Sequence, residues 1–288
     1  MSFSVGPAER SGNLRGEPRG NAAIIEIRDL TFRWRRGTPT ILAIDHLEIA
    51  RGERVFIEGP SGSGKTTLLS LLAGVVKAEQ GSLRILGQPL ERMGAVKRDH
   101  FRADHVGYVF QMFNLIPYLS LVENVTLPCR FSRLRRARVL ERTGCSRHSA
   151  RCLEEEALRL LDHLDMAKPA RSKRSVTELS VGQQQRVAAA RALMGSPEIL
   201  IADEPTSALD SDRREAFIRL LFRECAETRM SLIFVSHDAA LEPLFDRTVR
   251  LAEVNRALKP RPVRYAMFSD GIGCSRPDER WSQRGLRD

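Results

Sequence analysis

The chain of 288 residues is 42% hydrophobic and 28% charged, a composition typical of soluble globular proteins, and its length fits one large domain or two small ones. Its longest strongly apolar run, Leu68–Val76, is far too short to span a bilayer, and residues 1–20 lack the apolar core of a signal peptide, so we expect a cytoplasmic protein. The net charge of +10 suits an anionic partner, either nucleic acid or an anionic membrane leaflet.

The first part of the chain predicts an antiparallel sheet and the start of a nucleotide-binding core. Residues 1–22 are rich in Gly, Pro, Ser and charge, and we expect a disordered arm there. Apolar and polar residues then alternate over Ile25–Leu30 and Ile41–Ile49, the pattern of half-buried strands. An apolar strand, Val55–Gly59, runs into a Gly-rich turn, and Thr66–Val76 predicts a helix.

The remainder predicts helices around a buried parallel sheet. We expect short strands around Ser82–Leu86 and His105–Phe110, then a charged helical region over about 115–178 with a loop after Pro169. Strongly apolar strands alternating with helices are typical of a parallel sheet covered on both faces. These later elements are the helices Leu153–Leu164, Val187–Leu193 and Arg213–Cys225, the strands Ile199–Ala202 and Leu232–Val235, and a flexible basic tail at 259–288.

We assign no disulfide, metal-binding or dedicated binding role to the cysteines and arginines of the middle region. The five cysteines are odd in number and form no CxxC pair, so free thiols are expected rather than disulfides. Cys145, His148 and Cys152 lie close in sequence, but three ligands without a fourth make a poor zinc site. Arg130–Arg151 holds eight arginines and one acid, Glu141, and is expected to be a solvated surface.

Residues 59–66 match the pattern GxxxxGK[ST] between a predicted strand and a predicted helix. Backbone N–H groups of such a loop converge on phosphate oxygens, and the helix N-terminus adds positive potential. Lys65 is expected to reach the β- and γ-phosphates, and the Thr66 hydroxyl to bind Mg²⁺. The residues predicted to bind nucleotide here are Gly59, Pro60, Ser61, Gly62, Ser63, Gly64, Lys65, Thr66 and Thr67.

A second element is the apolar run Ile199–Ala202 followed by Asp203 and Glu204. Two carboxylates at the end of a buried strand indicate a site for a cation and a general base. We expect Asp203 to bind Mg²⁺ and Glu204 to orient and deprotonate the attacking water.

Four further motifs make the chain resemble ABC ATPases over about residues 24–255. Leu179–Arg186 (LSVGQQQR) closely resembles the ABC signature and begins 24 residues before Asp203, although Val181 stands where many members have glycine. Gln111 resembles the Q-loop glutamine, which would contact Mg²⁺ and nucleotide. Ser207–Asp210 resembles the D-loop, and His237 the switch histidine that contacts the γ-phosphate.

The resemblance implies a fold and a mechanism. The fold would be an α/β P-loop NTPase core with a mainly parallel sheet, an N-terminal antiparallel β subdomain and an inserted α-helical subdomain at about 115–178, all within residues 23–258. Two subunits would pair head to tail, with two ATPs and Mg²⁺ at the interface. The residues of one subunit that would meet the nucleotide of the other are Ser180, Gly182, Gln183 and Asp210.

The adenine is expected to stack on an aromatic residue near the N-terminus. Phe32 and Trp34 are both candidates, and family position favours Trp34, where a tyrosine is common.

Phe110–Pro128 resembles the lipoprotein-release, macrolide-export and cell-division group of ABC ATPases. The implied function is ATP hydrolysis that powers a membrane transporter, with a lean toward export or extraction. A membrane permease would dock near Phe113–Leu119 and hold the chain at the cytoplasmic face of the inner membrane. The apolar anchors expected there are Phe113, Leu115, Ile116, Tyr118 and Leu119.

Two alternatives remain open at this point. A regulatory ABC ATPase that transmits force through a permease-like partner to an extracytoplasmic enzyme would use the same chemistry. A nucleic-acid-linked ABC ATPase would suit the basic charge, but Lys65 and Ser180 are only 115 residues apart without sustained heptads, which argues against the coiled-coil members.

Overall fold

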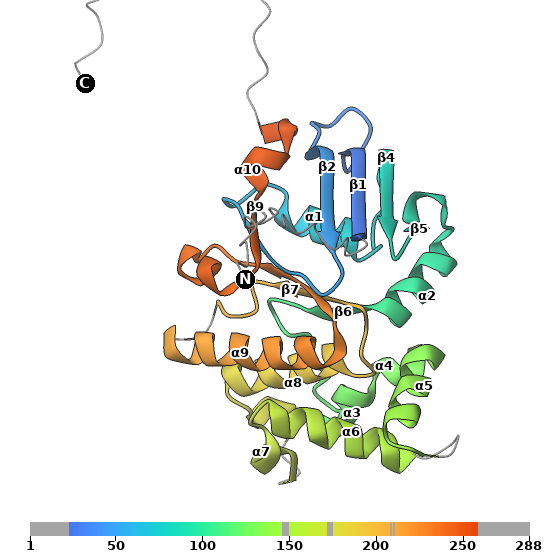
Figure 1. Cartoon of the computed structure of the whole chain (residues 1–288). Coiled ribbons are helices and arrows are strands. Elements are labelled where there is room, and N and C mark those ends of the chain that lie inside the picture. Colours follow the sequence, from blue (N-terminus) through green and yellow to red (C-terminus); the bar gives the residue numbers. More distant parts are fainter. Residues whose placement is uncertain (1–22, 146–149, 172–174, 208, 210, 259–288) are drawn as a thin grey trace, which may run out of the picture.

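The computed structural model describes residues 23–145, 150–171, 175–207, 209 and 211–258. Three layers follow one another in Figure 1: an antiparallel sheet at one end, a parallel sheet in the middle, and helices at the other end. The predicted arms at 1–22 and 259–288 lie outside the described residues, and the predicted domain bounds stay predictions. Within the described ranges, no helix is both long enough and apolar enough to cross a bilayer.

The antiparallel sheet has the strand order β2-β1-β4-β5. Ile25, Ile27 and Leu30 of β1 are fully buried while Glu26 and Arg28 are more exposed, as the alternation predicts, although Ile24 is buried as well. The predicted antiparallel sheet is therefore confirmed. Its strands are β1 (Ala23–Phe32), β2 (Leu42–Ala50), β4 (Gln80–Ile85) and β5 (Gln88–Pro89).

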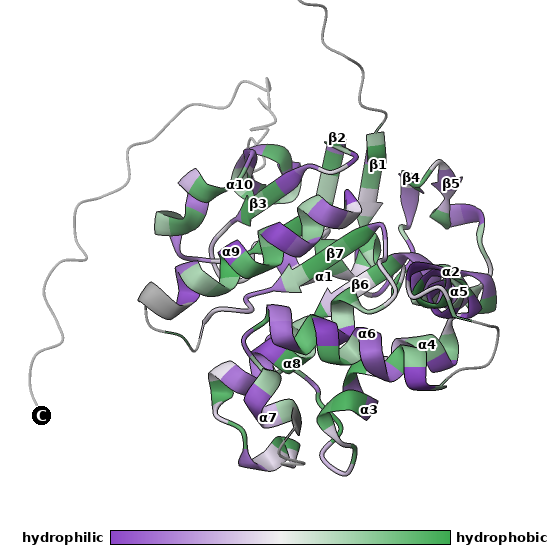
Figure 2. Cartoon of the chain, turned by 60° about the horizontal axis from the view of Figure 1, so that its bottom comes forward, coloured by the Kyte–Doolittle hydropathy of each residue, from purple (hydrophilic) through white to green (hydrophobic). Residues whose placement is uncertain are grey.

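The second sheet is parallel throughout, in the order β6-β7-β8-β3-β9. Every residue of β8 is buried, as expected for a strand covered on both faces, and Figure 2 shows β7 as hydrophobic. Helices α1 (Lys65–Leu72), α8 (Val181–Leu193) and α9 (Ser211–Thr228) connect these strands. The strands are β3 (Arg54–Glu58), β6 (Val106–Val109), β7 (Ile199–Asp203), β8 (Ser231–Val235) and β9 (Arg247–Arg250).

The remaining helices lie mostly in the region predicted to be helical. They are η1 (Leu90–Arg92), α2 (Ala95–His105), α3 (Leu121–Thr126), α4 (Pro128–Phe131), α5 (Arg133–Arg142), α6 (Ala150–His163), α7 (Ala167–Arg171), η2 (Val176–Glu178), η3 (Ala239–Leu244), α10 (Leu251–Val254) and η4 (Arg256–Leu258).

Three helix predictions need correction. Helix α2 was not predicted, because it buries no residue and so shows no apolar periodicity. Helix α8 begins at Val181 rather than Val187, since Ser180 caps it and its polar first turn hid the start. Pro169, after which a loop was expected, lies inside α7, whose first turn accommodates it, and residues 172–174 lie outside the described residues.

The arginine-rich stretch is only in part the solvated surface that we expected. Its exposed arginines include Arg130, Arg133, Arg142 and Arg151. Arg135, in contrast, is buried and donates to the carbonyl oxygens of Val106, Ala192 and Met194. Burial lowers the pKa of Arg135 to about 10, which still leaves it charged at neutral pH. Helix α5 therefore fastens the end of α8 to the start of β6 through a buried guanidinium.

The expectation of free thiols is wrong for two cysteines. Cys145 and Cys152 form a disulfide, with Cα atoms 6.6 Å apart, because the end of α5 and the start of α6 approach each other. Cys129 and Cys225 are buried free thiols, as expected. His148 and Cys274 lie outside the described residues.

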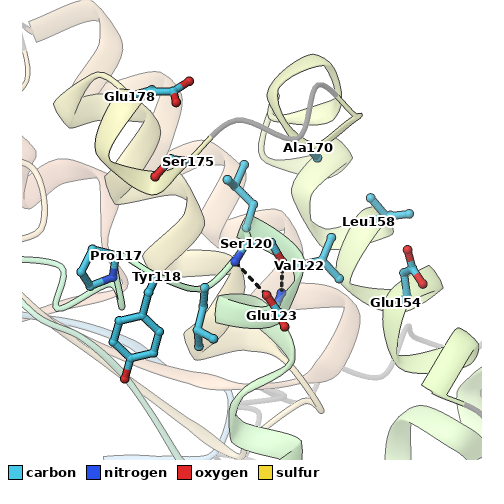
Figure 3. A pocket seen from close by; sticks show the side chains of 12 residues that line it. Pro117, Tyr118, Ser120, Val122, Glu123, Glu154, Leu158, Ala170, Ser175 and Glu178 are labelled. Atoms are coloured by element: carbon cyan, nitrogen blue, oxygen red, sulfur yellow. Dashed lines mark hydrogen bonds between the residues drawn. The ribbon is translucent and has the colours of Figure 1, made fainter.

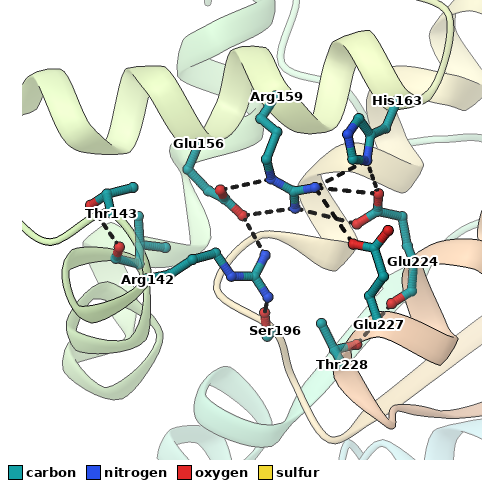
Figure 4. A network of polar contacts seen from close by, with 10 residues as sticks. Arg142, Thr143, Glu156, Arg159, His163, Ser196, Glu224, Glu227 and Thr228 are labelled. Carbon is teal, nitrogen blue, oxygen red and sulfur yellow. Dashed lines mark hydrogen bonds and ion pairs between the residues drawn. The ribbon is translucent and has the colours of Figure 1, made fainter.

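A buried ionic cluster joins α6 to α9 (Figure 4). Arg159 of α6 lies between Glu156 and Glu224, whose side chains are both 3% exposed. Its Nε is 2.9 Å from Glu156 Oε2, and its Nη2 is 3.3 Å from Glu224 Oε2. His163 Nδ1 reaches the second oxygen of Glu224, and Arg142 of α5 reaches Glu156 at 2.9 Å. The helical region is thus tied to α9 by partly exposed cations that contact two buried carboxylates.

Arg159→Leu should lower the free energy of unfolding by about 1–3 kcal/mol, because two buried carboxylates lose their shared donor while Arg142 and His163 still contact them. Arg151→Leu is the matched control on the same helix, since its pair with Glu155 is exposed and should contribute under about 1 kcal/mol. Urea denaturation of both variants measures the difference. Equal losses in the two variants would contradict the structural role of the cluster.

Candidate functional site

The parallel sheet sets the polarity of the candidate site. Ile57 pairs with Val235, Asp203 with Val235, and Val109 with Ala202, so β3, β6, β7 and β8 end side by side. The loops that leave these ends carry the predicted phosphate loop, Gln111, Glu204 and His237. Ligands of open parallel sheets bind at this carboxyl edge.

The phosphate loop, residues 59–64, connects β3 to α1. Gly64 caps α1 with φ 98°, and a Cβ there would lie 2.9 Å from Leu42 Cδ2, so only glycine fits. The first turn of α1 contains no acidic residue, which leaves the positive helix end uncompensated. Lys65 Nζ donates to Gly59 O at 2.6 Å and to Pro60 O at 3.1 Å, so the ammonium lies over the loop.

The other predicted loop residues differ in exposure. Ser61, Gly62 and Thr66 are exposed, whereas Thr67 is 8% exposed and packs with the core face of α1. Ser63 is also buried, and its hydroxyl has no partner among the described residues.

Asn255 supports the phosphate loop and was missed by the sequence analysis. This fully buried residue follows α10, and its Nδ2 donates to Ile41 O at 2.8 Å and Ser63 O at 3.3 Å. Its Oδ1 accepts from Ala43 N at 2.8 Å. No local pattern marks it, because the residues it bonds are about two hundred positions earlier in the chain.

The predicted acidic pair lies at the end of β7. Burial raises the pKa of Asp203, and the neighbouring carboxylate of Glu204 adds to this effect, while the Tyr108 hydroxyl and Lys65 oppose it. Tyr108 on β6 places its hydroxyl 3.5 Å from Asp203 Oδ2. Half-buried carboxylates held this close together favour a bound cation that neutralises them.

Glu204 and His237 lie together. His237 Nδ1 is 3.0 Å from Glu204 Oε2, and Glu204 itself adopts φ 44° while its N–H donates to Val235 O. A non-glycine residue in this left-handed region is held there by its surroundings. Arg214 of α9 pairs with Asp238, which fixes the turn that carries His237.

Gln111 is exposed at the start of a loop whose backbone is fixed by Arg191 of α8. Phe113 and Asn114 have φ 58° and 48°, and Arg191 donates to both of their carbonyl oxygens at 2.6 Å. Asn124, fully buried in α3, holds the next residues by bonding both backbone groups of Ile116. Neither support was anticipated from the sequence, because an arginine or asparagine in a helix has no distinguishing pattern.

The signature segment forms the first turn of α8. Ser180 caps the helix, since its Oγ accepts from Gln183 N and the Gln183 side chain accepts from Ser180 N. Gly182 is half-buried, and a Cβ there would lie 3.2 Å from Leu209 Cδ2. Within the described residues, no hydrogen bond or ion pair joins this turn to the phosphate loop. Asp210 lies outside the described residues.

The two candidates for adenine stacking differ sharply in exposure. Phe32 is 5% exposed and belongs to the core, whereas Trp34 is 58% exposed and meets Phe32 edge to face at 5.1 Å between ring centroids. Only Trp34 offers a free ring face, which favours it as the stacking residue.

The predicted apolar anchors after Gln111 are only partly exposed. Tyr118 is 84% exposed, but Phe113 and Leu115 are partly buried against the core of the helical region, which corrects the expectation that they are free anchors. They are buried because α3, α6 and α8 need apolar cover at this end. Tyr118 and Leu119 line a groove of about 890 Å³ between α3, α6 and η2 (Figure 3).

Comparisons with known proteins agree on the family. The family model described as "ABC transporter" matches residues 42–207. The uncharacterized ABC transporter ATP-binding protein YbbA of Escherichia coli K12 is 43% identical over 214 residues, which is 74% of this chain and 86% of YbbA. The lipoprotein-releasing system ATP-binding protein LolD of Porphyromonas gingivalis is 38% identical over 230 residues, covering 80% of this chain and 97% of LolD.

A solved structure shows the same fold. The dimeric ATP-binding cassette MJ0796, bound to ADP and Pi, superposes with a TM-score of 0.68 at 32% identity, covering 78% of this chain and 93% of that one. The predicted fold class is therefore confirmed.

Asn255→Leu should lower the free energy of unfolding by several kcal/mol, because three buried backbone groups lose their partner at about 1–3 kcal/mol each. It should also weaken nucleotide binding, since the Ser63 carbonyl belongs to the phosphate loop. Arg256→Ala is the control, because its pair with Asp45 is exposed. Thermal melts and fluorescent-nucleotide titration measure both effects, and a variant as stable as the control would contradict them.

Proposed function

The chain belongs to the ABC transporter family of ATP-binding proteins, and from this membership we propose that it powers a membrane transporter of the export or extraction kind. That it is an ATPase subunit of a transporter follows from the family and the relatives. The direction of transport is our proposal, and it is supported by the likeness to LolD, a lipoprotein-releasing ATPase subunit. The observation that carries the proposal is the open groove at Tyr118 in the same short loop as Gln111.

ATP would bind along the loop that connects β3 to α1. Backbone N–H groups of residues 61–64 and the open end of α1 would hold the phosphates, and Lys65 would turn from the carbonyls of Gly59 and Pro60 to the β- and γ-phosphates. The exposed ring of Trp34 would stack on adenine.

The carboxyl edge also suits Mg²⁺. The proposed ligands are oxygen donors, as Mg²⁺ prefers: the Thr66 hydroxyl, the Asp203 carboxylate and the Gln111 amide. Burial and the neighbouring Glu204 carboxylate raise the pKa of Asp203, which supports a neutralising cation at this position. When bound, Mg²⁺ would neutralise the phosphate charge that develops during transfer.

Hydrolysis would depend on Glu204. Its carboxylate would accept a proton from a water molecule while the oxygen of that water forms a bond to the γ-phosphorus. The bond between the γ-phosphorus and the oxygen shared with the β-phosphate would break at the same time. His237 Nδ1 already contacts Glu204 Oε2, so His237 would hold the carboxylate in place and lie close to the γ-phosphate. ADP and inorganic phosphate leave.

A second subunit would complete each site. Ser180 caps α8 and leaves the N–H groups of Val181 and Gly182 free at the positive end of the helix. No described residue hydrogen-bonds to these two N–H groups, and the phosphates of a partner's ATP would fit them, with Gln183 and Asp210 also contacting the nucleotide. MJ0796, which is dimeric with ADP and Pi, supports this arrangement.

Glu204→Gln should bind ATP normally but hydrolyse it orders of magnitude more slowly, because the water loses its base while Gln keeps the shape. The variant should also dimerise when ATP is added, because the ATP held between the two subunits is not hydrolysed and the dimer cannot reopen. Phosphate release and size-exclusion chromatography measure the two effects. Near-normal turnover would reject Glu204 as the base.

The permease is proposed to dock in the groove at Tyr118 and to hold the chain at the cytoplasmic face of the membrane. Because Arg191 and Asn124 fix the loop between Gln111 and Tyr118, a partner seated there would be mechanically linked to the nucleotide site. A regulatory ATPase that acts on an extracytoplasmic enzyme through such a partner would use the same contact. Nucleic acid is not the partner that we propose.

Tyr118→Asp should release the protein from membranes of its host, because it puts a charge on an apolar contact surface. Phe131→Asp is the control, since Phe131 is 71% exposed on α4 but does not line the groove. Membrane fractionation is the measurement, and nucleotide titration verifies folding. ATPase stimulation by DNA or RNA, without membrane association, would instead favour the nucleic-acid alternative.

A further inference from the structure

Tyr108 of β6 lies beside the carboxylate that we propose as a ligand of Mg²⁺. Strands β6 and β7 are parallel, with Tyr108 opposite Ile201 and Val109 opposite Ala202. Because side chains alternate along a strand, Tyr108, Ile201 and Asp203 point to one face of the sheet. This is the face that α1 covers, since Ile201 and Tyr108 pack with the apolar residues of that helix. The shared face brings the Tyr108 hydroxyl to 3.5 Å from Asp203 Oδ2.

The ring of Tyr108 is held by its neighbours. It is partly buried against the core below α1, and it stacks on Phe110 with ring centroids 4.3 Å apart and planes 30° apart. Phe110 directly precedes Gln111, another proposed ligand of Mg²⁺. The stack therefore fixes the direction of the hydroxyl, and Tyr108 connects the end of β7 to the residue before Gln111.

A tyrosine hydroxyl is suited to orient a metal-binding carboxylate. Its ordinary pKa of about 10 keeps it protonated at neutral pH, so it donates to the carboxylate and adds no charge to the site. It contacts one oxygen of Asp203, and the other oxygen can still bind a cation. Loss of such a hydrogen-bond partner typically weakens metal binding by about 10–100-fold. Because 3.5 Å is at the long limit of a hydrogen bond, we expect the lower end of that range here.

We propose that Tyr108 is a positioning residue for Mg²⁺: its hydroxyl holds the Asp203 carboxylate in the orientation that binds the metal, and the stack on Phe110 holds the hydroxyl. This inference rests on the proposed binding of Mg²⁺ by Asp203 and adds a residue that acts through this ligand. A tyrosine that only fills the core would need its ring but not its hydroxyl. Tyr108→Phe separates the two roles, because it keeps the ring and removes the hydroxyl.

The test measures the metal affinity of the full-length chain with bound nucleotide. A fluorescent ATP analogue that cannot be hydrolysed is bound without Mg²⁺, with protein in excess, and Mg²⁺ is then added until the fluorescence change is complete. Tyr108→Phe should raise the midpoint of this titration about tenfold. Its affinity for the analogue in EDTA should stay unchanged. Excess Mg²⁺ should restore most of its ATP turnover, because only metal binding is weakened.

Two further variants calibrate the titration. Ser132→Ala also removes a buried hydroxyl that donates to a carboxylate, that of Asp104, which precedes the start of β6, whereas the candidate site lies at its end. It should lower the melting temperature and leave the Mg²⁺ midpoint unchanged. Asp203→Asn removes the proposed ligand itself and should abolish the response to Mg²⁺.

The outcomes separate this inference from the proposed function. An unchanged or lower midpoint in Tyr108→Phe, while Asp203→Asn does not respond, overturns the role of Tyr108 and leaves the proposed metal site standing. A loss of turnover in Tyr108→Phe that excess Mg²⁺ does not reverse also overturns it. A normal response to Mg²⁺ in Asp203→Asn overturns the proposed metal site and this inference together.

Discussion

The common direction of four strands governs the whole candidate site. Because β3, β6, β7 and β8 are parallel and nearly in register, each delivers the residue that follows it to one edge of the sheet. Gly59 follows Ile57 by two residues, Gln111 follows Val109 by two, and His237 follows Val235 by two. The phosphate loop, the carboxylates of Asp203 and Glu204, the Gln111 amide and the His237 imidazole thus lie along one edge of the sheet. They come from segments that are far apart in the sequence. The antiparallel sheet and the helical region add support and contact surfaces to this edge.

The loop after Gln111 is stiff, and its stiffness comes from side chains rather than from regular structure. Arg191 holds two residues in the left-handed region, and Asn124 holds the segment that leads to Tyr118. Arg191 belongs to α8, the helix that Ser180 caps. The loop after Gln111 and the turn at Ser180 are therefore fastened to the same helix, so we expect a displacement of one to be passed to the other. A flexible loop of the same length would absorb such a displacement and would not transmit it.

Sequence patterns predicted what depends on local spacing. Alternation located β1 and β2, apolar runs located β7 and β8, and the GxxxxGK[ST] spacing located the turn into α1, because each of these is a property of neighbouring residues. Long-range supports escaped prediction: Arg135, Arg159 and Asn255 bond to backbone or carboxylate groups that only folding brings near. The same reason explains the cysteine error, since the approach of α5 and α6 that pairs Cys145 with Cys152 leaves no mark in their spacing.

The position of Asn255 has a consequence for biosynthesis. This residue bonds Ser63 O and Ile41 O, 192 and 214 positions earlier in the chain, and β9 pairs with β3 just before it. On the ribosome, where residues are added at about 5–20 per second, the phosphate loop would emerge on the order of ten seconds before its last support. Throughout that interval the phosphate loop lacks the hydrogen bond from Asn255 to Ser63 O. The nucleotide site is therefore closed by one of the last parts of the domain to be made, and nascent or shortened chains that stop before Asn255 would not bind ATP as the complete protein does.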